Sequence, residues 1–327
     1  MGNHENQDHP EEGPAARTGT RPKRIFGGSV LIGVLIVLQL IFLGDRVSPL
    51  HVRALLLPLL LWALVLGTYA FHAGRERLRL EEKLQLASEI QMSLLPESGL
   101  SLDGCDIEGL CNPVEHVGGD FFDYWIQNGR LCVMIADVTG HDVGAALLSA
   151  SLRSVVRGQS TVAENVAHVA DQVNRVIYPD MVRSEMLVTL CYLEIDPRAG
   201  QLTYCRCGHP RPLLVQRDEE KWLSTGGMLL GVREDAHFEE ESVDLSPGDT
   251  LVLYTDGVIE AEGPDGAMFG TERLAETVRA APDRSPRALV DHIVATVDSH
   301  TASKAPRDDV SVVVAGVGSR ESGVASR

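Results

Sequence analysis

Residues 185–207 of the chain read EMLVTLCYLEIDPRAGQLTYCRC. Two β-rich runs, 185–195 and 201–207, are separated by DPRAG, in which Pro197 and Gly200 favour a tight turn. This arrangement predicts a β-hairpin, and a hairpin pairs its strands in the antiparallel sense. An antiparallel sheet is therefore expected around these residues.

Further strands and helices are predicted on both sides of the hairpin. Apolar β-rich runs lie at 130–138, 249–257 and 308–317, and helical patterns at 143–178, 271–280 and 286–298. Because strands dominate the two ends of the region and helices cluster between them, the order favours α+β layers over a repeated βαβ unit. This domain is expected to cover residues 97–317, and a short polar tail follows at 318–327.

The charge balance limits the partners of the chain. Its 327 residues contain 29 Lys and Arg against 46 Asp and Glu, which gives a net charge of -17. Duplex nucleic acid requires a basic face, so no nucleic-acid partner is expected. The acidic surface would also repel a phosphorylated substrate, unless bound metal ions reverse the local charge. The six cysteines form no C-x-x-C pair, which argues against a structural zinc site.

The N-terminal segment differs in composition from the rest. Residues 1–24 are polar and predict a disordered tail, whereas residues 25–43 and 54–71 are two uncharged apolar runs. Each run approaches the length of a membrane-spanning helix. A cleaved signal peptide would require a small-x-small site after the first run, and none is evident. Buried core helices are disfavoured because both runs are apolar on every face.

Basic residues indicate how such a hairpin of two spans would be oriented. Arg and Lys lie before the first run and after the second, and fewer lie in the segment 44–53 between them. This distribution places both ends on the cytoplasmic side. The predicted location is therefore the cell membrane, with two spans and with the N-terminus and the following domain in the cytoplasm.

Residues 72–96 are the predicted helical linker. Apolar residues recur there at the spacing of a coiled-coil seam, with one polar member: Leu80, Leu84, Ala87, Gln91 and Leu94. A coiled coil would make the chain a homodimer through this linker. The alternative is an amphipathic helix that packs on the next domain, and two heptads do not decide between them. Pro96 ends the helix in either case.

Carboxylates recur where apolar strands end or begin. Asp120 lies in VGGDFFD, Asp137 in VMIADVTGHD, Asp256 in LVLYTDG, and Asp308 and Asp309 in RDDVSVVVA. Each one alone is an ordinary turn or cap residue. If the strand ends converge, however, so many carboxylates could not all ionise without cations. Oxygen ligands of this kind suit Mg²⁺ or Mn²⁺.

The motifs VGGDFFDYW, ADVTGHDVGAALLSA, CGHPRPLLV, LVLYTDGVIEA and DDVSVVV occur in this order. In this order they resemble PPM-type metal-dependent serine/threonine phosphatases, and most closely the bacterial SpoIIE-type branch. The resemblance covers about residues 88–317, and ASEIQMSLLP is similar to the helical linker that precedes such domains. It implies an antiparallel β-sandwich flanked by helices, in four layers αββα, with metal ions at one edge.

The resemblance also implies the roles of individual residues. Asp120, Asp137, Asp256 and Asp308 would bind two Mn²⁺ or Mg²⁺ ions through their carboxylates, and Val138 through its carbonyl group. Four further positions would support this site: Gly119, His141, Asp142 and Asp309. Metal-activated water would hydrolyse phosphoserine or phosphothreonine without a covalent phosphoenzyme. By analogy, the substrate would be a phosphorylated regulatory protein such as an anti-sigma-factor antagonist.

The sequence departs from the family pattern at Asp142, where the family usually has glycine. Asp142 is expected to cap the following helix, and the alternative is an added charge near the metal ions. His141 could donate a proton to the leaving group, since its ordinary pKa suits that task.

Two other functions remain to be considered. Cys205 and Arg211 have the spacing of a thiol phosphatase loop, but Pro210 and Pro212 remove backbone donors from it, and the residues after Arg211 predict a strand. The other alternative is a non-catalytic membrane sensor or scaffold with a phosphatase-like domain. It would have no need to keep four carboxylates close together.

Overall fold

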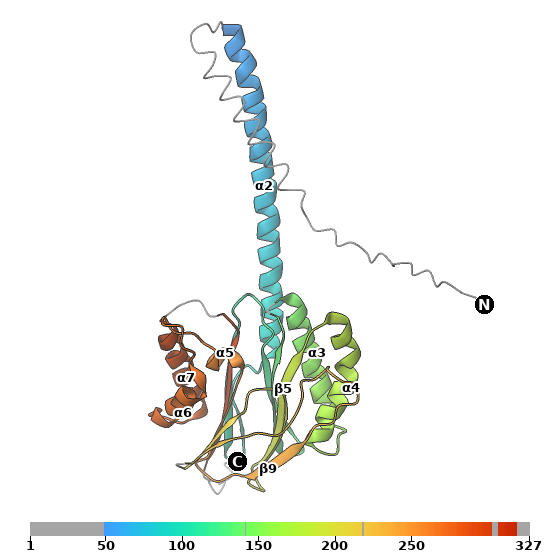
Figure 1. Ribbon diagram of the computed structural model, residues 1–327, viewed down its shortest axis with the longest axis vertical. Coiled ribbons are helices and arrows are strands. Elements are labelled where there is room, and N and C mark those ends of the chain that lie inside the picture. Colours follow the sequence, from blue (N-terminus) through green and yellow to red (C-terminus); the bar gives the residue numbers. More distant parts are fainter. Residues whose placement is uncertain (1–48, 141, 218, 303–306, 319–327) are drawn as a thin grey trace, which may run out of the picture. The chain divides into compact units, whose positions relative to one another are not determined.

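The computed structural model describes residues 49–140, 142–217, 219–302 and 307–318 (Figure 1). The chain divides into two units, with the boundary between Glu81 and Glu82. The first helix, α2 (Pro49–Leu94), runs across this boundary. Each unit is described by itself.

The predicted membrane spans fall in the N-terminal unit. The first span, 25–43, lies outside the described residues, and the second, 54–71, lies on α2. Among the residues that the structure describes, no helix combines the length and the apolar character needed to cross a membrane. Large apolar side chains of α2 such as Leu61, Leu64 and Phe71 are exposed. The two spans stay predictions.

Two antiparallel sheets form the second unit. One has six strands in the order β1 (Leu100–Leu102), β2 (Cys105–Asn112), β11 (Val310–Val317), β10 (Thr250–Tyr254), β7 (Leu213–Gln216) and β8 (Glu219–Trp222). The other has five in the order β3 (Phe121–Gln127), β4 (Arg130–Val138), β5 (Val188–Asp196), β6 (Gln201–Cys207) and β9 (Glu240–Asp244). The predicted hairpin is confirmed as β5 and β6, and its last pair before the turn is Asp196 with Gln201.

Helices cover the outer face of each sheet. On the five-stranded sheet these are α3 (Val143–Ser160) and α4 (Val166–Ser184), and on the six-stranded sheet α7 (Pro286–Thr301), with α6 (Gly270–Ala280) packed against α7. The short α5 (Asp256–Ile259) lies against β11. Figure 1 shows the two helical layers on opposite sides of the strands. The α+β fold with antiparallel sheets between helices is confirmed.

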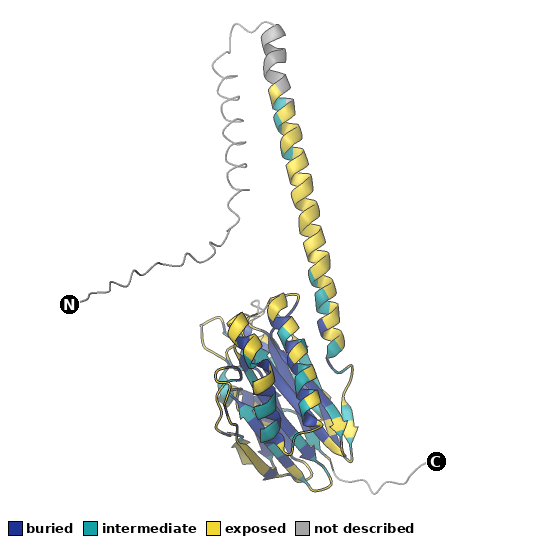
Figure 2. Cartoon of the chain, turned by 90° about the vertical axis from the view of Figure 1, so that its right-hand side faces the viewer, coloured by how far each residue is buried: buried dark blue, intermediate teal, exposed yellow. Residues whose placement is uncertain are grey.

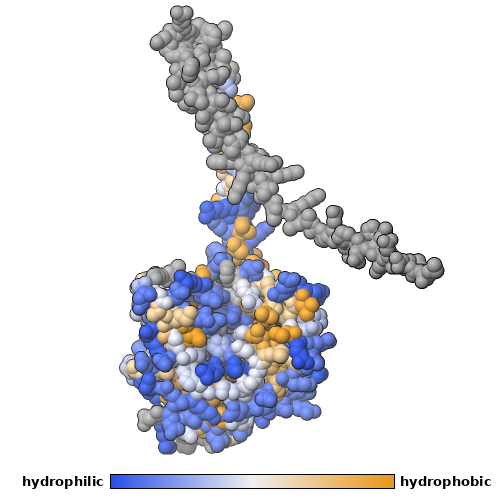
Figure 3. Space-filling view, viewed as in Figure 1, coloured by the Kyte–Doolittle hydropathy of each residue, from blue (hydrophilic) through white to orange (hydrophobic). Residues whose placement is uncertain are grey.

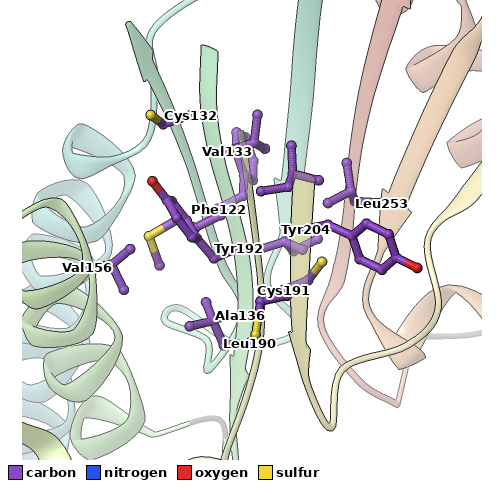
Figure 4. Close-up of a cluster of buried hydrophobic side chains, with 14 of the residues drawn as sticks. Phe122, Cys132, Val133, Ala136, Val156, Leu190, Cys191, Tyr192, Tyr204 and Leu253 are labelled. Atoms are coloured by element: carbon purple, nitrogen blue, oxygen red, sulfur yellow. The ribbon is translucent and has the colours of Figure 1, made fainter. Parts of the chain in front are cut away.

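Strand β11 shows how the sequence fills both cores. Val312 and Val314 belong to the cluster beneath α6 and α7, whereas Val313 and Ala315 belong to the cluster between the sheets. Successive side chains of a strand point to opposite faces, so a strand buried on both faces must be apolar throughout. Figure 4 shows part of the larger core, with Val156 of α3 on one side and Leu253 of β10 on the other.

Burial falls off from the strands to the outer surface. The strands in the middle of each sheet are almost wholly buried, and the outward faces of the helices are exposed (Figure 2). The face seen in Figure 3 is mostly hydrophilic, with smaller apolar patches among the charged residues. This pattern is that of a water-exposed domain with its own core.

The end of α2 packs on the domain that follows it. Gln91 is buried, Leu84, Ala87 and Leu94 are half-buried, and Leu80 is exposed. Leu94 contacts the core between the sheets. Over these last turns, the alternative of an amphipathic helix packed on its own domain is therefore confirmed. Homodimerisation through the linker stays a prediction.

Candidate active site

The predicted carboxylates come from the ends of four strands. Asp120 precedes β3 and Asp137 lies near the end of β4, where Phe121 pairs with Ala136. In the other sheet, Tyr254 of β10 pairs with Val312 of β11. Asp256 follows that end of β10 and begins α5, and Asp308 precedes β11. The antiparallel pairing thus brings each pair of sequence-distant residues to one edge of its sheet.

Hydrogen bonds join these two edges across the sandwich. The Oγ1 of Thr255 donates to Oδ2 of Asp120 at 2.6 Å. The buried carboxylate of Asp309 accepts from the backbone N–H groups of Val114 at 2.7 Å and Gly119 at 2.8 Å. Asp309 also accepts from the N–H of Asp120 at 3.4 Å. Asp309 therefore holds the segment before β3 against the start of β11.

The pKa values show that these carboxylates affect one another. Burial, together with the charges of Asp256, Asp308 and Asp309, raises the pKa of Asp137 to about 7. Burial raises the pKa of Asp120 well above its usual range; the charge of Asp137 adds to this, and the hydrogen bond from Thr255 opposes it. Burial and the neighbouring Asp308 also raise the pKa of Asp256. The protein thus holds several carboxylates where ionisation of all of them is unfavourable.

The donor chemistry of this edge fits a hard divalent cation. Its candidate ligand atoms are carboxylate oxygens and, at Val138, a backbone carbonyl that lies close to Gly119. A Cβ atom on Gly119 would meet that oxygen at 2.1 Å, so only glycine fits there. Over the described residues, no group of three or more His, Cys, Asp or Glu side chains is placed to hold a metal ion. The fit is thus one of ligand type and charge, and not of a preformed cage.

The Gly-His-Asp sequence after β4 is partly described. Asp142 is the N-cap of α3, and its Oδ1 accepts from the N–H of Ala145 at 3.0 Å. The expected capping role of Asp142 is confirmed. Gly140 has a φ of 101°, in the region that favours glycine. His141 lies outside the described residues.

The Gly-His-Pro element lies beside this edge. His209 is buried, and its Nδ1 lies 2.7 Å from Oγ1 of Thr189. Thr189 is the cross-strand partner of Asp137. Burial lowers the pKa of His209 to about 3, so the ring is neutral near pH 7. His209 therefore positions a neighbour of the carboxylates.

Gln91 of α2 reaches the same edge. Its Nε2 donates to the carbonyl of Gly118 at 2.7 Å, and the N–H of Gly118 donates to its Oε1 at 3.1 Å. Both bonds are buried. Asp120 lies two residues after Gly118 in the chain. The linker helix therefore directly holds the segment that carries this carboxylate.

Three of these positioning residues were missed in the sequence analysis. Thr255 carried no signal beyond a hydroxyl next to Asp256, and Thr189, between Val188 and Leu190, carried none. Gln91 carried one, because it is the single polar member of an apolar seam and a buried amide requires hydrogen-bond partners.

The thiol phosphatase alternative is wrong. Cys205 is fully buried in β6, between β5 and β9. The guanidinium of Arg211 lies 5.9 Å from the ring centre of Trp222, a cation–π contact. A nucleophilic thiolate must be accessible to phosphate, and this thiol is enclosed by apolar side chains.

The sequence and fold are similar to those of known proteins. The family model described as Stage II sporulation protein E (SpoIIE) matches residues 127–318. Protein IcfG of Synechocystis sp. is 27% identical over 269 residues, which cover 73% of this chain and 42% of that protein. Phosphoserine phosphatase RsbP of Bacillus subtilis is 27% identical over 239 residues, with 71% and 57% covered. The chain thus spans about half the length of these relatives.

Solved structures share this architecture. The SiaA-PP2C domain of Pseudomonas aeruginosa superposes with a TM-score of 0.65 at 24% identity, covering 73% of this chain and 97% of that one. The RsbU and RsbW domains of a Mycobacterium tuberculosis protein give a TM-score of 0.58 at 28% identity, with 69% and 62% covered. These likenesses support the fold.

Proposed function

This chain belongs to the SpoIIE family, and on that premise we propose that it is a membrane-anchored, metal-dependent protein phosphatase. The observation that carries this proposal is the grouping of carboxylates at one edge. There, in addition to burial, the charge of Asp137 raises the pKa of Asp120. The charge of Asp308 likewise raises the pKa values of Asp137 and Asp256. A structural role does not require like charges in repulsive proximity, whereas a site for divalent cations does.

The chain's own residues would hold and orient two Mn²⁺ or Mg²⁺ ions. The ligands would be Asp120, Asp137, Asp256, Asp308 and the carbonyl of Val138. When bound, such ions supply an activated water and offset the charge of a phosphoryl group. Thr255 fixes one oxygen of Asp120, and Asp309 fixes the backbone on either side of Gly119. This backbone anchoring keeps the ligand carboxylates within reach of one another.

The proposed substrate is a phosphoserine or phosphothreonine of a cytoplasmic regulatory protein. Two Bacillus subtilis relatives are named phosphoserine phosphatases, RsbP at 27% and RsbU at 25% identity. By this analogy the substrate would be an anti-sigma-factor antagonist. Divalent cations at the proposed site would suit a phosphate ester, and the relatives suggest which kind of protein carries it.

The proposed anchor is the pair of apolar runs at 25–43 and 54–71. Their uncharged composition and the exposed apolar side chains of α2 support this location, since such side chains are stable when covered by lipid. The distribution of basic residues around the two runs supports a cytoplasmic phosphatase domain.

Substitution of one carboxylate tests the proposed activity. We expect the full chain with Mn²⁺ to release phosphate from p-nitrophenyl phosphate and from a phosphoserine peptide. Asp256→Asn should lower kcat/KM at least a hundredfold, because the carboxylate charge is lost at the cation site. Asp291→Asn, an exposed change on α7, is the matched control. A wild-type rate in Asp256→Asn would contradict the metal assignment, and binding of phosphopeptide without turnover would support the non-catalytic alternative.

A further inference from the structure

A cavity of about 260 Å³ lies beside the carboxylate edge, between α5, α7 and the start of β11. Two lining residues belong to that edge: Asp308 is itself a candidate metal ligand, and Gly257 follows the candidate ligand Asp256 in the chain. Helices α5 and α7 pack on β11 from separate parts of the chain (Figure 1). A group bound in this cavity would therefore lie next to a phosphate held at the carboxylates.

The wall of the cavity is acidic. Among the described residues that line it, Glu260, Glu262 and Asp298 accompany Asp308, and Arg307 is the one cation. Arg307 and Glu262 form an ion pair with each other, so their charges offset. Within the described part of the chain, neither Glu260 nor Asp298 takes part in an ion pair. These two exposed carboxylates are left to bind a cation from outside.

The floor of the cavity is apolar. Val297 of α7 and Val310 of β11 are buried and line it, and Met268 adds an adaptable side chain at its border. Lysine and arginine combine an apolar stem with a charged end, and they bury the stem on apolar surface while the charge stays near polar groups. The cavity offers both surfaces that such a side chain requires.

We propose that this cavity binds a lysine or arginine side chain of the phosphoprotein substrate, close in sequence to its phosphoserine. The proposal rests on the proposed function, since it places the phosphate at the neighbouring carboxylates. Asp308 belongs both to the candidate metal site and to the lining of the cavity, so the two sites adjoin. An extended peptide advances about 3.3–3.6 Å per residue. The basic residue therefore lies within about three residues of the phosphoserine. An acidic residue at that position is repelled by Glu260 and Asp298.

A lysine scan of phosphoserine peptides tests this subsite. Each peptide has alanine around the phosphoserine and one test residue, placed in turn at the three positions on either side. The test residue is lysine, norleucine, which keeps the stem without the charge, or glutamate. With the full chain and Mn²⁺, we expect kcat/KM to be about fivefold higher for lysine than for norleucine at one or two positions, and lowest for glutamate.

Variants of Asp298 link the preference to the cavity. In Asp298→Asn the ratio of lysine to norleucine should fall towards one, and in Asp298→Lys the glutamate peptide should become the better substrate of the charged pair. Asp291→Asn removes one charge from the same helix outside the cavity and should keep the wild-type ratio.

The outcomes separate this proposal from the proposed function. Norleucine equal to or better than lysine at every position would overturn the proposal, and so would a preference that persists unchanged in Asp298→Asn. If the wild-type chain hydrolyses p-nitrophenyl phosphate yet shows no such preference, the subsite fails and the phosphatase stands. If it hydrolyses neither p-nitrophenyl phosphate nor any peptide, the phosphatase assignment itself fails, and the subsite with it.

Discussion

At the scale of single residues, Asp137 shows how burial and like charge act together. Its pKa of about 7 is raised first by burial and then by Asp256, Asp308 and Asp309. In the unfolded chain its pKa returns to the ordinary range near 4. The folded protein therefore binds the proton more tightly than the unfolded protein does, and a cation bound at the proposed site would take the place of that proton.

The pH dependence of stability follows from this difference. Without divalent cations, the contribution of Asp137 is fully present below about pH 4 and is lost as the pH rises towards 7, at up to about 4 kcal/mol. We expect Asp137→Asn to remove that part of the pH dependence. Urea unfolding of both proteins in EDTA at pH 5 and pH 7.5 measures it. An equal change of unfolding free energy between the two pH values in both proteins would contradict the raised pKa of Asp137. Added Mn²⁺ should restore the stability of the wild type and not that of Asp137→Asn.

At the scale of elements, α2 acts on the site through Gln91. Gln91→Ala leaves both backbone groups of Gly118 without partners in a buried place, which we expect to cost about 1–3 kcal/mol. We also expect kcat to fall and the Mn²⁺ requirement to rise, because the segment carrying Asp120 is released. Gln85→Ala is the matched control, since Gln85 is exposed on the same helix. Similar kcat values in the two variants would show that α2 is only a connector.

Helix α3 is attached to β3 by a buried carboxylate. Asp123 is 1% exposed and forms ion pairs with Arg153 at 2.8 Å and Arg157 at 2.6 Å. Asp123→Asn leaves two arginines without their partner, and we expect the unfolding free energy to fall by about 3–5 kcal/mol. Asp180→Asn breaks an exposed pair with Arg183 and should change it by less than about 1 kcal/mol. Urea unfolding compares them, and equal effects would contradict the structural role of Asp123.

Two of the strands that the sequence did not predict share a cause. Strands β8 and β9 read EEKW and EESVD and lie at the edges of their sheets. Charged residues suit exposed edge strands because they discourage pairing with other chains, but they also remove the alternation that predicts a strand. The region 143–178, where helical patterns are predicted, contains α3 and most of α4, and Asn165 caps α4.

At the scale of the whole molecule, the proposed membrane anchor makes its own prediction. We expect the full chain to sediment with membranes, to remain there after high-salt and alkaline washes, and to be released by detergent. The domain should be digested by protease added from the cytoplasmic side only. Release by salt alone would contradict two membrane spans and leave the phosphatase assignment intact.

The sequence by itself determined the local elements and the type of site. The β5–β6 hairpin, α6, α7 and the largely apolar β11 follow from turn residues and side-chain periodicity, which act over a few residues. The five motifs identified the family and named the carboxylates. The expected role of Asp142 as a helix N-cap also depends only on neighbouring residues, and it is confirmed.

Only the tertiary structure decided how distant residues meet. Asp309 holds the N–H of Gly119 across 190 positions of sequence, and Thr255 holds Asp120 across 135. Gln91, which the sequence places in a coiled-coil seam, instead hydrogen-bonds to Gly118 beside the site. The cavity beside Asp308 forms where α5, α7 and β11 meet. Such contacts depend on which sheets pack face to face, and no periodicity within a segment encodes that choice.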